Sequence, residues 1–165
     1  MQTLEKEKPV QSKRNRLVIV CSKGSLDMAY SPLMLATTAA VMGMEVRLYF
    51  TFWGMNMITK KIIDSVKISP VSNPALPMPN ILGMIPGMSS MVTSMMTKKT
   101  QKMKMPSVRE MIAIAKESGV KINACCPSPK MMGLTKDDPI SEVDDIIGAT
   151  TYFDLASEDA MTLLV

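Results

Sequence analysis

The sequence contains no histidine, only three cysteines and few aromatic residues, which make up 4% of its 165 positions. Without histidine, the chain lacks the most common general base and the most common metal ligand of proteins. A structural zinc site needs four Cys or His ligands, so we expect no metal. The small, odd number of cysteines argues against a secreted disulfide scaffold. A net charge of +4 with so few aromatic residues also argues against nucleic-acid binding.

Long apolar runs are missing as well. No purely apolar run reaches the about eighteen residues that a membrane-spanning helix needs, and the charged residues 1–16 do not resemble a signal peptide. We therefore expect a cytoplasmic protein. Hydrophobic residues still make up 47% of the chain, which is typical of a folded globular domain.

The order of the predicted elements indicates an α/β fold. Residues 1–15 are polar and are predicted to form a flexible tail, whereas 16–165 are predicted to form a single domain. The predicted strands cover 17–20, 45–50, 120–124 and 149–153. The predicted helices cover 27–42, 55–66, 106–117, 129–134, 141–147 and 156–163. This alternation predicts three layers, a parallel sheet with helices on both faces, interrupted by a proline-, methionine- and lysine-rich excursion at 70–105.

Cys125 is the strongest candidate for chemistry. It directly follows the strand at 120–124 and precedes a short helix, at the sheet edge where sites of parallel α/β folds form. Helix N-terminal amides and the nearby Lys130 would favour the nucleophilic thiolate. Cys126 is adjacent and Cys21 ends another strand, so both are possible supporting residues. The alternative is that these cysteines are buried as small hydrophobic side chains.

A second candidate site is the turn after the first strand. Lys23 and Gly24 lie there, directly before a helix whose first amides could bind an anion. The glycine-rich phosphate-binding pattern GxxxxGK[ST] is absent, and an ordinary strand-to-helix turn is the alternative.

The excursion carries a methionine stripe at helical spacing. Its members recur on one face of a predicted helix and are followed by lysines: Met88, Met91, Val92, Met95 and Met96, then Lys98, Lys99, Lys102 and Lys104. Such a stripe fits a core, a self-assembly interface, a docking surface for a partner protein, or peripheral membrane contact through 78–105.

Three stretches resemble one known family. Residues 22–30, 42–54 and 124–134, together with the excursion, resemble the DsrE/DsrF-like family and in particular its DsrE-like subgroup. The resemblance implies a Rossmann-like parallel sheet and homo-oligomers. It also implies that Cys125 accepts sulfur as a persulfide or thiosulfonate, and that it exchanges this sulfur with a small TusA-like carrier, in some cases alongside a rhodanese.

These observations lead to one preferred function and two alternatives. The preferred function is a sulfur carrier or sulfurtransferase that works on Cys125 without a cofactor. The first alternative is a non-catalytic oligomeric scaffold that binds a partner or a membrane through its Met-rich surface. The second is a thiol peroxidase, which the absence of both a CxxC motif and histidine disfavours.

Overall fold

The computed structural model describes residues 15–67, 90, 93–95, 102, 104–135, 137–156 and 160–165. Nearly all of the predicted tail at 1–15 and most of the excursion at 70–105 lie outside these residues. The predictions of a flexible tail, a methionine stripe and membrane contact through 78–105 therefore stay predictions. Among the described residues, no helix is long and apolar enough to cross a membrane.

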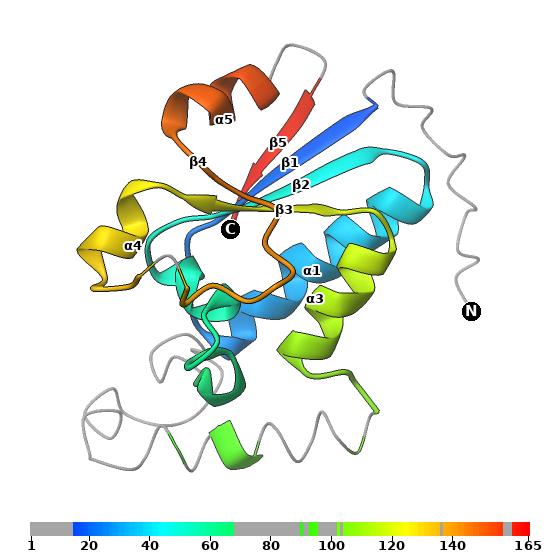
Figure 1. Cartoon of the computed structure of the whole chain (residues 1–165). Coiled ribbons are helices and arrows are strands. Elements are labelled where there is room, and N and C mark those ends of the chain that lie inside the picture. Colours follow the sequence, from blue (N-terminus) through cyan, green and yellow to red (C-terminus); the bar gives the residue numbers. More distant parts are fainter. Residues whose placement is uncertain are drawn as a thin grey trace, which may run out of the picture.

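The described part of the chain contains a five-stranded, fully parallel sheet (Figure 1). Its spatial order is β4-β3-β2-β1-β5. The strands are β1 (Arg16–Cys21), β2 (Glu45–Phe50), β3 (Lys121–Cys125), β4 (Asp145–Ile147) and β5 (Ala160–Leu164). Helices α1 (Leu26–Val41) and α3 (Val108–Glu117) lie side by side on one face, and α5 (Ala149–Leu155) lies on the other (Figure 1). The α/β fold with helices on both faces is as predicted.

The two faces of the sheet differ in composition. Alternate residues of the strands pack against α1 and α3 and form the apolar core. They are Leu17, Ile19 and Cys21 on β1, Val46, Leu48 and Phe50 on β2, and Ile122 and Ala124 on β3. The same alternation directs Tyr49, Asn123 and Cys125 to the α5 face. The core face is therefore apolar, whereas the α5 face carries polar side chains.

Helix termini follow local sequence signals. Gly43 follows α1 with φ 86° and Gly119 follows α3 with φ 89°, a left-handed conformation that favours glycine. The start of α3 differs from the prediction, which placed Pro106 at the first helical position. Ser107 is the N-cap instead, because its side chain and that of Glu110 form a reciprocal capping box.

The segment after β2 and the C-terminal region contradict the predictions. A helix predicted at 55–66 is replaced by two 3-10 helices, η1 (Phe52–Ile58) and η2 (Ile63–Ser65). The predicted helix at 141–147 contains strand β4, the predicted helix at 156–163 overlaps strand β5, and the predicted strand at 149–153 lies in helix α5. Pairing decided these cases, because β4 continues the sheet beside β3 and β5 continues it beside β1.

Candidate functional site

Cys125 is the last residue of β3 and lies on the α5 face of the sheet. Phe50 of β2 pairs with Ala124, so Thr51 and Cys125 come next on adjacent strands. Cys125 itself pairs with Ile147 of β4. Helix α4 (Pro127–Met131) begins directly after the Cys125–Cys126 pair. The end of the sheet thus places Cys125 between β2, β4 and the start of α4.

Cys125 is only 7% exposed, and hydrogen-bond donors act on its thiol. Burial by itself raises the pKa of Cys125, because it disfavours the charged thiolate. Hydrogen bonds from the side chains of Ser128, Thr51 and Tyr49, and from the backbone of Ser128, outweigh burial and hold the pKa below its ordinary value. The thiolate, which is the nucleophilic form of cysteine, is therefore favoured at this site.

The turn after β2 supplies part of this donor set. The Phe52 amide donates to Ser128 Oγ at 3.1 Å, and Thr51 Oγ1 lies 3.3 Å from the same oxygen. Phe52 has a φ of 46°, an uncommon and strained backbone conformation for a bulky residue. Thr51 and Phe52 precede Ser128 by 77 and 76 positions in the sequence. The turn brings both of them to the Ser128 hydroxyl group.

Tyr49 also connects the cysteine to α5. Its ring stacks on Tyr152 of α5 with the ring centroids 5.0 Å apart, and Tyr152 meets Phe153 edge-on at 5.4 Å. Burial, followed by the hydrogen bond to Cys125, raises the pKa of Tyr49. Its hydroxyl therefore keeps its proton and remains a hydrogen-bond donor throughout the pH range in which Cys125 ionises.

Cys21 does not join this site. It ends β1 at the same edge of the sheet, as the sequence predicted, but its side chain belongs to the core on the opposite face. Burial raises its pKa, and its thiol lies 3.9 Å from the Ile19 carbonyl oxygen, to which it donates. The structure therefore does not bring Cys21 together with Cys125, because the two side chains lie on opposite faces of the sheet.

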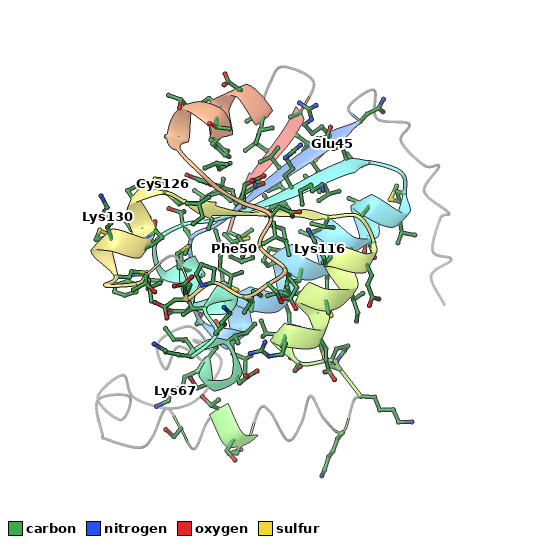
Figure 2. All side chains as sticks on the ribbon, viewed as in Figure 1. Glu45, Phe50, Lys67, Lys116, Cys126 and Lys130 are labelled. Atoms are coloured by element: carbon green, nitrogen blue, oxygen red, sulfur yellow. The ribbon has the colours of Figure 1, made fainter. Side chains whose placement is uncertain are left out.

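Cys126 is exposed, in contrast to its neighbour. It is the N-cap residue of α4, and its amide donates to the Ile147 carbonyl oxygen at 2.9 Å. Figure 2 shows Cys126 at the α4 end of the molecule, where Lys130 points away from the sheet. The contacts described for Cys126 do not involve the Cys125 thiol, so a supporting role for Cys126 stays a prediction.

The predicted anion-binding residues Lys23, Gly24 and Lys130 do not supply the hydrogen bonds that lower the pKa of Cys125. Neither Lys23 nor Lys130 is among the groups that act most strongly on the pKa of Cys125. Hydroxyl groups and the Ser128 amide lower this pKa most, and a contribution from Lys130 stays a prediction. Gly24 has a packing role, because a Cβ atom there would lie 2.0 Å from the Trp53 carbonyl oxygen. Anion binding by these residues stays a prediction.

Two exposed aromatic side chains lie beside the site. Phe52 is 54% exposed and Trp53 is 66% exposed, and both follow Thr51 directly. Met131, at the end of α4, is also exposed. We call Phe52, Trp53 and Met131 the apolar rim. Exposed aromatic and methionine side chains are common on surfaces that bind a protein partner.

Sequence reasoning missed Tyr49, Thr51 and Ser128 as functional residues. Tyr49 and Thr51 carried a usable signal, because residues two apart at the end of a strand share a face. Ser128 had no comparable signal beyond lying in the loop after Cys125. The Ser128 hydroxyl is held by the Phe52 amide, which lies 76 positions earlier in the sequence.

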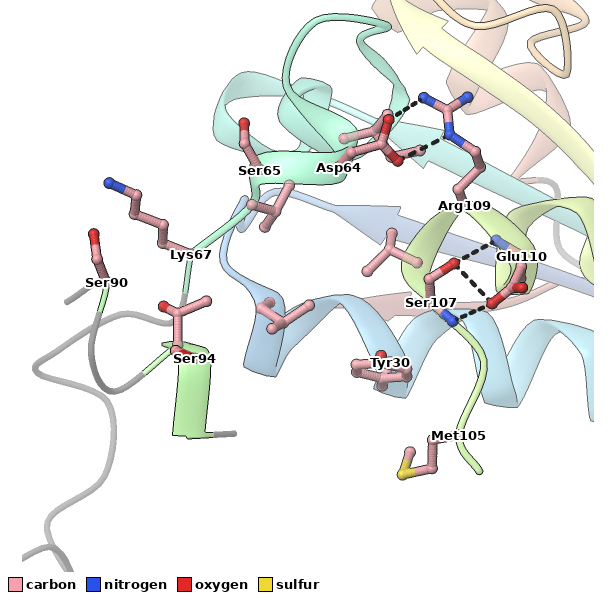
Figure 3. Close-up of a pocket in the computed structure, with 15 residues that line it drawn as sticks. Tyr30, Asp64, Ser65, Lys67, Ser90, Ser94, Met105, Ser107, Arg109 and Glu110 are labelled. Carbon is pink, nitrogen blue, oxygen red and sulfur yellow. Dashed lines mark hydrogen bonds and ion pairs between the residues drawn. The ribbon is translucent and has the colours of Figure 1, made fainter. Parts of the chain in front are cut away.

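A hollow lies away from Cys125, on the helical side of the molecule (Figure 3). It is lined in part by Tyr30 of α1 and by the start of α3, and its charged groups are largely paired with each other. Arg109 donates to Asp64 at 2.8 and 2.9 Å, and Glu110 accepts from Ser107. These pairs have structural roles. Within the described ranges, no group of three or more potential ligands could hold a metal ion.

Comparisons with known proteins agree with this architecture. Residues 13–164 match the DsrE/DsrF/DrsH-like family. The sulfur carrier protein DsrE2 of Allochromatium vinosum is 35% identical over 160 residues, which cover 92% of this chain and 99% of that protein. The uncharacterized protein YrkE of Bacillus subtilis strain 168 is 29% identical over 162 residues, which cover 91% and 96%.

A solved structure supports the fold independently. The ychN protein from E. coli superposes with a TM-score of 0.54 at 13% identity, covering 92% of this chain and 99% of that chain. At this identity, the likeness concerns the fold alone. The family match and the similarity to DsrE2 both extend over nearly the whole chain, so the chain belongs to the DsrE/DsrF/DrsH-like family.

Proposed function

We propose that this protein is a cytoplasmic sulfur carrier or sulfurtransferase that holds sulfur on Cys125 and exchanges it with a TusA-like partner. The observation that carries the proposal is the set of hydroxyl donors around Cys125, which favours its thiolate despite burial. The similarity to the sulfur carrier protein DsrE2 supports the same role. Free cysteines, as here, persist in reducing compartments such as the cytoplasm.

The proposed loading step needs only the thiolate. The Cys125 thiolate attacks the outer sulfur of a donor persulfide, forming a new S–S bond with that atom. The S–S bond within the donor breaks, and its electron pair leaves with the donor thiolate. No external oxidant or reductant is needed. With a donor that carries a thiosulfonate (donor–S–S–SO3−), the Cys125 thiolate attacks the sulfane sulfur next to the sulfonate and forms a new S–S bond with it. The bond between that sulfur and the donor cysteine breaks, the donor thiolate leaves with the electron pair, and the thiosulfonate anion is then held on Cys125.

The apolar rim supports exchange with a protein partner. Phe52 and Trp53 are exposed in the turn whose Phe52 amide contacts Ser128, so a docked carrier could bring its own thiol to Cys125. We include a TusA-like carrier, and a rhodanese as a possible donor, in the proposal. We also propose a homo-oligomer, because exposed Phe153 and Leu164 offer apolar area on the thinly covered α5 side.

Mass spectrometry of the intact protein tests the loading step. After incubation with polysulfide and removal of excess reagent, the parent should gain the mass of one or more sulfur atoms, whereas Cys125→Ser should gain none. Cys126→Ser is the matched control, since it removes the exposed neighbouring thiol. It should load like the parent. Equal loading of Cys125→Ser and the parent would overturn the assignment of Cys125.

A second arm tests the partner. A loaded TusA-like carrier replaces polysulfide as the donor, and transfer is followed by the masses of both proteins. We expect transfer to the parent and to Cys126→Ser, and none to Cys125→Ser. Loading from polysulfide without transfer from the carrier would retain Cys125 as a sulfur acceptor and reject this class of partner.

A further inference from the structure

We propose that Ser128 stabilises the Cys125 sulfur as the leaving group when loaded sulfur is passed on, and that it thereby sets the rate of release. This inference rests on the proposed function and deepens it. It assigns a role to a buried residue three positions after Cys125, whose hydroxyl and amide lower the pKa of that cysteine.

The geometry around Ser128 limits where its proton can go. Its hydroxyl oxygen accepts from the Phe52 amide at 3.1 Å, so that side of the oxygen is occupied. The single hydroxyl proton is then left for the Cys125 sulfur or for Thr51 Oγ1, which lies 3.3 Å away. Ser128 is only 3% exposed, so water does not readily compete for this proton.

The backbone of Ser128 acts in the same direction. Pro127 precedes it and has no N–H, so Ser128 carries the first amide of α4 that can donate to the preceding loop. This amide also bonds to Cys125. One residue thus directs both an amide and a hydroxyl towards the same sulfur.

The charge on this sulfur changes during the transfer. In the loaded protein, the inner sulfur of Cys125 is uncharged and bonded to the outer sulfur, which carries the negative charge or a proton. An acceptor thiolate attacks the outer sulfur and forms the new S–S bond. The bond to Cys125 breaks, and its electron pair stays on the inner sulfur, which becomes a thiolate again.

The hydroxyl protons can follow that charge. With a neutral inner sulfur, Ser128 and Thr51 can donate to one another across 3.3 Å, and with a thiolate both can turn to sulfur. Charged acceptors form the stronger hydrogen bonds, so the donors stabilise the product of release more than the loaded state. A more stable leaving thiolate leaves faster. Ser128 therefore favours release over retention of the load.

The test uses the full chain in a Cys126→Ser background and compares Ser128→Ala, Ser128→Thr and Ser118→Ala. Ser118 is a matched control, because it is an exposed serine that donates to the Ile114 carbonyl oxygen on α3, away from Cys125. Each protein is loaded with polysulfide. Cyanide is then added as a small nucleophile that attacks the outer sulfur, and thiocyanate release is followed over time.

We expect Ser128→Ala to release thiocyanate about three- to tenfold more slowly than the background protein. Its alkylation by iodoacetamide before loading should reach its plateau at a higher pH. Ser128→Thr, which keeps the hydroxyl, should restore both properties at least in part, and Ser118→Ala should change neither.

Parental release and an unchanged pH profile in Ser128→Ala would overturn the role of Ser128 while leaving Cys125 as the carrier. A parent that takes up no sulfur would instead reject the proposed function. In that case the pH profile of alkylation still shows whether Ser128 stabilises the thiolate.

Discussion

Cys21 and Cys125 end two strands at the same edge of the sheet, are both buried, and yet have opposite acid–base properties. Little of either side chain meets solvent, since Cys21 is 1% exposed and Cys125 is 7% exposed, but Cys21 lies deeper in the apolar core than Cys125 does. Burial raises the pKa of Cys21, whereas hydroxyl and amide donors outweigh burial at Cys125 and lower its pKa. The comparison indicates that depth in the core and hydrogen-bond donors together determine which thiol becomes a nucleophile.

The two faces of the sheet explain why only one cysteine has donors. Helices α1 and α3 cover the Cys21 face with apolar side chains, which offer no hydrogen bonds to a thiolate. On the other face, α5 has only seven residues and none of them is buried. Polar strand residues such as Tyr49 can therefore reach Cys125, and a reagent needs to displace little structure to do so.

The largest expected difference is in alkylation. In native protein carrying Cys126→Ser, iodoacetamide at pH 7 should modify Cys125 at least about a hundredfold faster than Cys21, because Cys21 reacts only when its sealed core opens. The Cys125 rate should rise with pH and level off below the pH at which an ordinary thiol does, since its lowered pKa completes ionisation earlier. Peptide mass mapping over time measures both rates.

Unfolded protein provides the control for this experiment. In concentrated urea the two cysteines lose their different surroundings, so their rates should become similar. Equal rates in the native protein, or a Cys125 plateau above that of an ordinary thiol, would contradict the difference between the two sites.

Gly54 packs the turn that carries Thr51 and Phe52 against the Cys21 backbone, and its substitution should have the next largest effect. A Cβ atom there would lie 2.0 Å from the Cys21 carbonyl oxygen, so Gly54→Ala must displace the turn that carries Thr51 and Phe52. We expect a loss of about 3 kcal/mol in the free energy of unfolding. Slower alkylation of Cys125 should accompany it. Urea unfolding and the alkylation assay measure the two effects.

Gly148→Ala is the matched control, because the nearest contact of its added Cβ is 3.9 Å away. Gly148 is the N-cap of α5, where alanine is a poorer residue, so a loss of about 1 kcal/mol or less is expected. Similar losses in both variants would show that the close packing against Cys21 does not hold the turn.

Asn123→Leu should have the smallest effect and the opposite sign. Asn123 is 2% exposed on the α5 face, and its Oδ1 atom is buried without a hydrogen-bond partner among the described residues. An apolar side chain of similar size should raise the free energy of unfolding by about 1 kcal/mol, because an unpaired buried acceptor is removed. Urea unfolding tests this. A clear loss of stability would mean that the amide is bonded in solution.

The sequence predicted the first half of the fold better than the end. Strand β2 has the predicted bounds, and β1, α1 and β3 differ from the predictions by one or two residues. Their apolar runs and glycine stops are strong local signals. At the C-terminus, Thr150–Phe153 favour a strand locally, but the segment is helical and places Tyr152 on Tyr49. Local preference was overridden by tertiary contacts that the sequence does not display.

The candidate site divides in the same way. Cys125 could be predicted, because a cysteine between a buried strand and a helix is a local pattern. Its donors could not be assigned, since Thr51 and Ser128 are 77 positions apart and meet only through the pairing of β2 with β3. Lys130 is not among the groups that lower the pKa of Cys125 most, because closeness in the chain does not by itself direct a long side chain at a buried sulfur.

The sequence by itself determined the apolar strands, the order of the first strands and helices, and the presence of a cysteine at the carboxyl end of β3. Only the tertiary structure decided which face each cysteine occupies and which groups contact it. The physical reason is that ionisation depends on donors within a few ångströms, and strand register brings these donors together from distant parts of the chain.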